Sequence, residues 1–139
     1  RPRIIAEEYL DPAGGQTGLT DYKVMCFGGR VRCEFTCTGR ADGNLCVDFF
    51  DTEWNHLPFT RHYPNADVYP EVPERLKNMM AMAERLSEGM PFVRVDFYEV
   101  AGQYYFGEMT FYPGSGMEEF DPERWDEELG SWIELPELD

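Results

Sequence analysis

Three charged side chains that could bind phosphate or a metal ion occur in two segments of alternating apolar residues: Arg94, Asp96 and Glu108. Alternate residues of a β-strand point to the same face, so Arg94 and Asp96 lie opposite the apolar residues of their segment. Carboxylate oxygens are ligands that Mg²⁺ prefers, and a planar guanidinium can bind phosphate oxygens in pairs. The pattern therefore indicates either a cation site or an ion pair on a strand hairpin.

The relative position of the two acids depends on the loop between segments 92–99 and 103–111. A three-residue loop, with Gly102 in the left-handed conformation, places Arg94 opposite Glu108, and Asp96 opposite Phe106 and diagonal to Glu108 at about 7 to 8 Å. Both acids then share one face, whereas a two-residue loop would place them on opposite faces. On the residues alone, an ion pair between Arg94 and Glu108 is favoured over a Mg²⁺ site that also holds nucleotide phosphates, and both interpretations stay open.

The strand and helix patterns around these residues predict a single α+β domain over residues 1–139. This domain would consist of an antiparallel sheet with one main helix packed on it. Gly28 and Gly29 are typical of a two-residue turn between strands. The other predicted strands and connections are strands at 3–10, 22–27, 31–38 and 45–50, a glycine-rich connection at 11–20 and an irregular one at 60–73.

Helical periodicity predicts a main helix over 73–89 and a short acidic helix from Asp121 to Leu129, ended by Gly130. The apolar stripe of the main helix is interpreted as packing onto the sheet rather than as a ligand site; it consists of Leu76, Met79 or Met80, Ala83 and Leu86. The C-terminal tail is expected to be anchored by Trp125, Leu129, Trp132 and Leu135.

Composition excludes several classes of protein. The net charge is −15 and the only lysines are Lys23 and Lys77, which argues against nucleic-acid binding. No apolar run is long enough for a membrane span and no signal-peptide pattern is present, so a cytoplasmic location is expected. The four cysteines have no CxxC spacing and are expected to be structural thiols: Cys26, Cys33, Cys37 and Cys46.

The segment RVDFYEVAGQYYFGEMTFYPG resembles the C-terminal metal-binding hairpin of ATP-grasp ligases, in which an Arg-x-Asp strand is followed by a turn, Glu-x-Asn and Pro-Gly. Thr110 stands here at the asparagine position. Together with IIAEEYL, DYKVMCFGGR, FFDTEWN and AERLSEG, the segment is similar to the TupA-like ATP-grasp family, which is linked to teichuronopeptide and other cell-surface polysaccharide synthesis. The similar segments cover nearly all of the chain in the family's order.

The resemblance implies a role for each matching residue. It places the adenine-binding hinge at Glu7, Glu8, Tyr9 and Leu10, a ribose contact at Asp21, and a phosphate or substrate contact at Lys23. It assigns the neutralisation of phosphate or acyl-phosphate oxygens to Arg40 and Arg94. Mg²⁺ binding is implied for Asp96, Glu108 and Thr110, and the substrate-side loop would begin at 113–116.

The resemblance also implies ATP and Mg²⁺ as cofactors and a carboxylate–amine ligation through an acyl phosphate, a reaction that depends on cations around an anionic centre. The implied partners are a nucleotide and a carboxylate and amine substrate pair that includes a surface glycan precursor. The chain begins at the hinge with Arg1, so we expect a C-terminal lobe that is part of something longer, that works with an N-terminal lobe or partner chain, and that has little turnover alone.

Two other hypotheses belong to different classes of function. One is a non-catalytic acidic binding module derived from an ATP-grasp lobe, in which Asp96 and Glu108 are leftover polar groups. The other is a small hydrolase that uses the two carboxyls as acid and base, and it is the least favoured because no second aromatic-lined cleft is evident.

Overall fold

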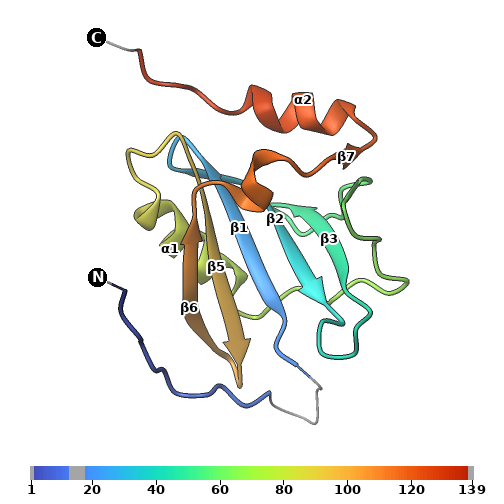
Figure 1. Ribbon diagram of the computed structural model, residues 1–139, viewed down its shortest axis with the longest axis vertical. Helices are drawn as coiled ribbons and strands as arrows, with labels where there is room; N and C mark the ends of the chain where they lie inside the picture. The colour runs from blue at the N-terminus through green and yellow to red at the C-terminus, as the bar shows by residue number, and fades with distance from the viewer. Residues whose placement is uncertain (1, 13–17, 138–139) are drawn as a thin grey trace.

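The computed structural model describes residues 2–12 and 18–137, and its centre is a five-stranded antiparallel sheet in the order β3-β2-β1-β5-β6 (Figure 1). Two short strands, β4 and β7, pair in a second sheet. The elements are β1 (Asp21–Phe27), β2 (Arg30–Thr38), β3 (Cys46–Asp51), β4 (Thr60–Arg61), α1 (Leu76–Leu86), β5 (Phe92–Val100), β6 (Gln103–Thr110), the 3-10 segment η2 (Pro113–Gly116), β7 (Phe120–Asp121) and α2 (Arg124–Ser131). The predicted α+β class is confirmed.

Tight turns set the register of the central strands. Gly28 and Gly29 join β1 to β2 with φ angles of 57° and 77°, values that favour glycine and match the twist of a two-residue hairpin. Lys23 of β1 therefore lies between Phe35 of β2 and Asp96 of β5. The predicted β1–β2 hairpin is confirmed, and the central strands bring charged residues from distant parts of the sequence side by side.

Alternation of side chains along the strands divides the core into two clusters, one on each face of the sheet. The cluster on the front face comprises Met25, Phe27, Cys33, Phe35, Cys37, Val47, Phe49, Phe59 and Leu129. The cluster on the back face comprises Val24, Cys26, Val31, Met79, Ala83, Val93, Val95 and Phe97. Helix α1 therefore packs on the back face, as its apolar stripe predicts, while α2 contributes to the front (Figure 1).

The turn between β5 and β6 differs from the predicted one. Ala101 and Gly102, with φ angles of 51° and 72°, form a two-residue turn, so Val100 pairs with Gln103. The prediction of a three-residue loop was wrong. Continued without interruption, this register would place the two acids on opposite faces of the sheet.

A β-bulge reverses that outcome. The pairing register shifts by one residue between Phe97, which pairs with Phe106, and Val95, which pairs with Met109. Two residues of β6, Gly107 and Glu108, therefore face the single residue Asp96, and Glu108 returns to the front face. Arg94 then pairs with Thr110 rather than with Glu108 as predicted, although all four polar residues share one face.

Glycine is favoured at the bulge because the two strands approach closely there. A Cβ atom at Gly107 would lie 3.1 Å from Tyr98 Cε2 and 3.2 Å from the backbone oxygen of Asp96. Both distances are shorter than ordinary van der Waals contact, so a larger residue would push β6 away from β5.

Several predicted boundaries need correction. Residues 3–10 form no strand, helix α1 is shorter than 73–89, and the predicted 11–20 connection lies partly outside the described residues. Helix α2 begins at Arg124 and contains Gly130, which was expected to end it. Trp125, Leu129 and Trp132 pack on the front face as expected, but Leu135 is 79% exposed and is not an anchor. Within residues 2–12 and 18–137, no helix has the length and apolar character needed to cross a membrane.

Candidate functional site

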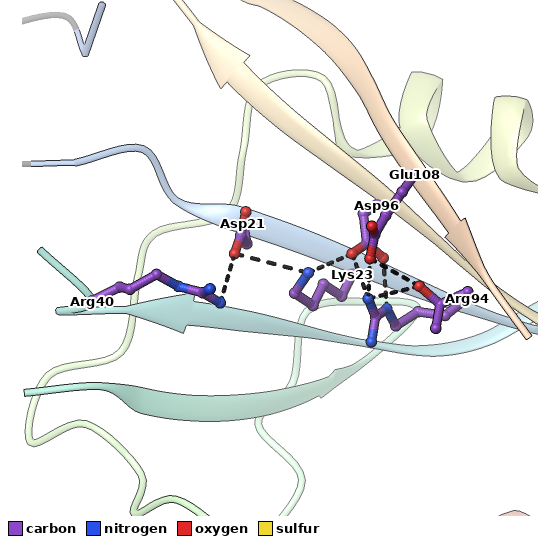
Figure 2. Close-up of polar contacts among 7 residues, drawn as sticks. Asp21, Lys23, Arg40, Arg94, Asp96 and Glu108 are labelled. Carbon is purple, nitrogen blue, oxygen red and sulfur yellow. Dashed lines mark hydrogen bonds and ion pairs between the residues drawn. The ribbon is translucent and has the colours of Figure 1, made fainter. Parts of the chain in front are cut away.

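Seven polar side chains form a continuous set of contacts on the front face, and we call this set the polar row (Figure 2). Its members come from the loop after β2 and from strands β1, β5 and β6: Arg40, Asp21, Lys23, Asp96, Arg94, Glu108 and Thr110. Acids and bases alternate along the row, so its three cations and three carboxylates balance. Six of these positions were predicted as charged site residues, and the structure brings all of them together.

Asp96 is the centre of the row and has only 1% of its surface exposed. Arg94 donates to both of its oxygens, Nε to Oδ1 and a terminal nitrogen to Oδ2, each over 2.7 Å. Lys23 bonds to the same Oδ2 from the neighbouring strand. Two cations therefore share one buried carboxylate, an arrangement that holds both of them in place only while the carboxylate is charged.

Arg94 links the buried centre to the outer edge of the sheet. Its terminal nitrogen donates to Glu108 Oε1 and to Thr110 Oγ1, each at 2.9 Å, and the Thr110 hydroxyl donates to the same Glu108 oxygen. The Glu108 side chain is 63% exposed, whereas that of Asp96 is 2% exposed. Glu108 therefore has free coordination positions facing solvent, and Asp96 has none.

The other end of the row lies near the start of β1. Arg40 donates to Asp21 Oδ2 over 3.2 Å, and the Lys23 ammonium lies 3.8 Å from the same oxygen. Tyr98 pairs with Asp21 across the strands, and burial together with the charge of Asp21 raises the pKa of its hydroxyl to about 12. Tyr98 is therefore a neutral hydrogen-bonding group at physiological pH.

The predicted hinge residues lie beside the same end of the face. A hollow of about 470 Å³ is lined by Glu7, Glu8, Leu10, Tyr98, Tyr105, Phe106, Gly107 and Glu108. Tyr9 is 81% exposed and is not among the lining residues. Three of the four predicted hinge residues therefore border a surface that includes the aromatic residues Tyr98, Tyr105 and Phe106 and that ends at Glu108.

The donor chemistry of the row suits a metal ion that is shared with phosphates. Glu108 and Thr110 offer oxygen atoms, and Mg²⁺ in proteins usually binds one or two carboxylates together with water or substrate phosphates. Both oxygens of Asp96 already bond to cations, so Asp96 fits a metal only after Lys23 or Arg94 turns away. Among the described residues, no group of three or more His, Cys, Asp or Glu side chains is positioned to hold a metal by itself.

Sequence reasoning missed a third buried cation on the front face. The Arg61 guanidinium lies over the Phe35 ring, 4.5 Å from its centroid, while that of Arg94 is 5.8 Å from the same centroid. Arg61 sits in a segment predicted to be irregular, and its nearest acid is Glu118 at 2.9 Å. Arg61 could not be recognised from an alternating strand pattern, because β4 is only two residues long. Glu118 lies outside the strands and helices and has no such pattern either.

The bulge residue Gly107 did have a signal in the sequence. An isolated glycine within a strand pattern indicates a bulge or a close backbone approach, and Gly107 stands between Phe106 and Glu108 in such a pattern. A bulge at this position, combined with a two-residue turn, would have given the observed faces.

The antiparallel sheet with a helix on its back face and charged residues on its open front face is compatible with one lobe of an ATP-grasp enzyme. The model of the family described as TupA-like ATPgrasp matches residues 1–134. The chain belongs to this family, which supports a role like that of an ATP-grasp ligase. Comparison with curated proteins and with solved structures found no match.

Proposed function

We propose that this chain forms the phosphate-facing wall of the nucleotide site in an ATP- and Mg²⁺-dependent carboxylate–amine ligase. The observation that carries the proposal is the pair of nearly buried cations, Lys23 and Arg94, that share Asp96 on the front face of the sheet. Family membership supports ATP as the nucleotide. The resemblance to proteins of cell-surface polysaccharide synthesis supports a glycan precursor as substrate and a cytoplasmic location, where ATP is available.

Lys23, Arg94 and Arg40 would receive the phosphate oxygens of the nucleotide and of the acyl phosphate. A guanidinium matches such oxygens in pairs, and its charge stays fixed at physiological pH. Glu108 and Thr110 would hold Mg²⁺ together with Asp96, and the ion would supply positive charge at the phosphoryl oxygens. The charge balance of the row supports this assignment, because an added anion must displace a carboxylate from a cation or bring its own counter-ion.

The aromatic hollow would take the adenosine part of the nucleotide. Tyr98 and Tyr105 offer flat apolar surface, and the backbone at Glu8 and Leu10 offers hydrogen-bonding groups for the base. Asp21, which pairs with Tyr98, would accept hydrogen bonds from the ribose hydroxyls. Because these residues form one open wall, we propose that a second lobe or partner chain supplies the opposite wall and that residues 1–139 alone turn over little substrate.

The competing hypothesis is a non-catalytic acidic binding module. It is favoured by the observation that every carboxylate of the polar row already has a cationic partner, so the row could be purely structural. The net charge of −15 would suit a basic partner. The two hypotheses differ in what they require of Glu108.

The deciding experiment measures Mg²⁺-dependent nucleotide binding by calorimetry on the natural full-length protein and on its Glu108→Gln variant. We expect the substitution to weaken binding of the Mg²⁺–nucleotide complex by about tenfold or more, as loss of a metal ligand does, with little effect on metal-free nucleotide. Glu53→Gln removes the same charge from an exposed site beyond β3 and serves as the matched control. Equal Mg²⁺ dependence in Glu108→Gln and the wild type would favour the binding module.

A further inference from the structure

Arg61 is a buried cation that does not belong to the polar row. It lies on β4 with 9% of its surface exposed, and its guanidinium stacks on Phe35 at 4.5 Å and on Phe49 at 5.5 Å. Burial lowers the pKa of the Arg61 guanidinium, the negative charge of Glu118 raises it, and the positive charge of Arg94 lowers it further. Two guanidinium groups are therefore held near each other on one apolar platform, which demands a nearby anion.

The anion that the structure supplies is poorly placed. Arg61 Nε and Glu118 Oε2 are 2.9 Å apart, but their alignment is not that of a hydrogen bond. Both atoms are buried, and neither has a hydrogen-bond partner among the described residues. A guanidinium normally binds a carboxylate through two parallel N–H···O bonds. Glu118 thus neutralises Arg61 without forming a hydrogen bond to its Nε–H group.

Glu118 lies at the border of two hollows, and Arg61 lies in the wall of one of them. The larger, about 730 Å³, is lined by Thr60, His62, Tyr63, Pro64, Gly114, Met117, Glu118, Glu119 and Asp121. The smaller, about 180 Å³, has both Arg61 and Glu118 in its wall. Glu118 lies two residues after η2, where Gly114, Ser115 and Gly116 have positive φ angles. A carboxylate that left Arg61 would therefore open the way between the two hollows.

We propose that Arg61 binds the carboxylate of the substrate that is to be activated, and that Glu118 occupies its place until the substrate arrives. The inference rests on the proposed ligase function and adds to it the residue that positions the carboxylate. Arg61 and Arg94 flank the same Phe35 ring, so a carboxylate on Arg61 would lie beside the cations assigned to phosphate. The larger hollow would hold the remainder of the substrate.

A carboxylate is preferred to a nucleotide phosphate as the ligand of Arg61 for two reasons. The residue already holds a carboxylate, that of Glu118, so a substrate carboxylate would take the same place beside the guanidinium while the Glu118 side chain moves toward solvent. The acids lining the larger hollow, Glu118, Glu119 and Asp121, would repel a polyphosphate. Both ligands are oxyanions, so the test must separate them.

The test uses the natural full-length protein with ¹⁵N-labelled arginine, follows the Arg61 Nε–H resonance by NMR, and titrates glutarate, inorganic phosphate and Mg²⁺–nucleotide separately. Glutarate should shift this resonance in the wild type. Glu118→Gln, which removes the internal competitor, should tighten glutarate binding by about three- to tenfold, because the free form of Arg61 becomes the main one. Glu119→Gln, an acid lining the same hollow but not paired with Arg61, should change the affinity by less than twofold.

Arg61→Lys keeps the charge and the aliphatic stem but removes the forked donor, so it should weaken glutarate binding about fivefold or more while the Mg²⁺–nucleotide affinity is unchanged. Circular dichroism checks that this variant is folded, and Glu118→Gln tests the inference independently if it is not. The inference is overturned if Glu118→Gln does not tighten glutarate binding, if Glu119→Gln has the same effect, or if phosphate or nucleotide shifts Arg61 and glutarate does not. Failure of the proposed function would appear separately, as an affinity for the Mg²⁺–nucleotide complex that is the same in Glu108→Gln and in the wild type.

Discussion

At the scale of single residues, the two acids of the β5–β6 hairpin have different tasks. Asp96 is buried and shared by Lys23 and Arg94, so it fixes the positions of the cations. Glu108 is exposed and contacts the outer side of Arg94 and the hydroxyl of Thr110. Residue types and spacing predicted that these side chains would gather, but burial separates a positioning carboxylate from an open one, and burial depends on packing across strands.

Another acid, Glu34, is buried on the back face and has no ion-pair partner in the described part of the chain. It pairs with Val24 and Phe50 in the sheet, is 2% exposed, and neither of its side-chain oxygens has a hydrogen-bond partner among the described residues. Burial, with a smaller contribution from the charge of Asp51, raises its pKa to about 8. The folded protein therefore keeps a proton on Glu34 at neutral pH.

This protonation predicts a stability that falls as pH rises. Between the ordinary glutamate pKa of 4.5 and about 8, the folded state binds a proton that the unfolded chain has released, so the free energy of unfolding should fall by up to about 1.4 kcal/mol per pH unit from this group. Glu34→Gln removes the group, and its unfolding free energy should show a smaller slope. Urea denaturation at pH 5, 6.5 and 8 measures both slopes.

Glu53→Gln is the control for the pH experiment, because it removes an exposed acid and should keep the wild-type slope. Asp48 also has a pKa raised by burial, but it is present in every variant and cancels in the comparison. Parallel slopes for Glu34→Gln and the wild type would mean that Glu34 is ionised in the folded protein.

At the scale of elements, the β5–β6 hairpin shows how much local sequence can predict. The strands, the turn region and the chemistry-bearing residues were visible, because apolar alternation and glycine spacing are local signals. The prediction that Asp96 and Glu108 share a face is correct, but its reason was wrong. The turn has two residues rather than three, which alone would move Glu108 to the other face, and the extra residue of the β-bulge moves it back. The face on which Glu108 lies depends on both the turn length and the bulge, and only the bulge is indicated in the sequence, by the isolated glycine Gly107.

Three other differences from the predicted structure depend on contacts that the local sequence pattern does not reveal. Residues 3–10 have strand-like apolar character, yet no described strand of the sheet pairs with them, so they form no ladder bonds and no regular secondary structure. Helix α1 begins three residues after Pro73, because the carbonyl of Arg75 accepts the first helical hydrogen bond, from Met79. Arg61 could not be identified from sequence, because its importance comes from the aromatic rings beneath it.

The bulge predicts a sharp contrast between two glycine substitutions. Gly107→Ala places a methyl group 3.1 Å from Tyr98 Cε2 and 3.2 Å from the Asp96 backbone oxygen, so it should destabilise the fold by about 1 to 3 kcal/mol and weaken Mg²⁺–nucleotide binding as Glu108 moves. Gly130→Ala adds a methyl group in open space within α2 and should be neutral or stabilising by up to about 1 kcal/mol. Urea unfolding and calorimetry measure the two effects. Equal stability of the two variants would show that the strands do not approach closely at Gly107.

At the scale of the whole molecule, the front face combines a covered half and an open half. Phe59, Trp125 and Leu129 cover the aromatic core beside β3, while the two ends of the polar row, at Arg40 and Glu108, and the hollow near Glu8 are open to solvent. The boundary between the halves runs along Phe35, over which Arg61 and Arg94 both lie. The molecule therefore places its cations at the edge of its own core, although 27 acids against 12 basic residues make it strongly anionic.

That charge predicts a stability that rises with salt. Repulsion among surface acids acts over about 30 Å at 0.01 M ionic strength but only about 8 Å at 0.15 M, whereas the buried pairs of the polar row are screened much less. The urea midpoint should therefore increase across this range in NaCl, and equally in choline chloride, which controls for specific binding of sodium. A midpoint that falls with salt would show that attractive surface pairs outweigh the repulsion.

The bulge in β6 has a further consequence for how the molecule behaves at high concentration. β6 is an edge of the five-stranded sheet, and Tyr105 and Phe106 on it are 40% and 55% exposed. A straight edge with apolar side chains offers a template on which a second molecule can add a strand and begin aggregation. The extra residue at Gly107 and Glu108 breaks the spacing of backbone donors and acceptors along that edge. The irregularity that brings Glu108 to Arg94 thus also protects the protein from edge-to-edge association.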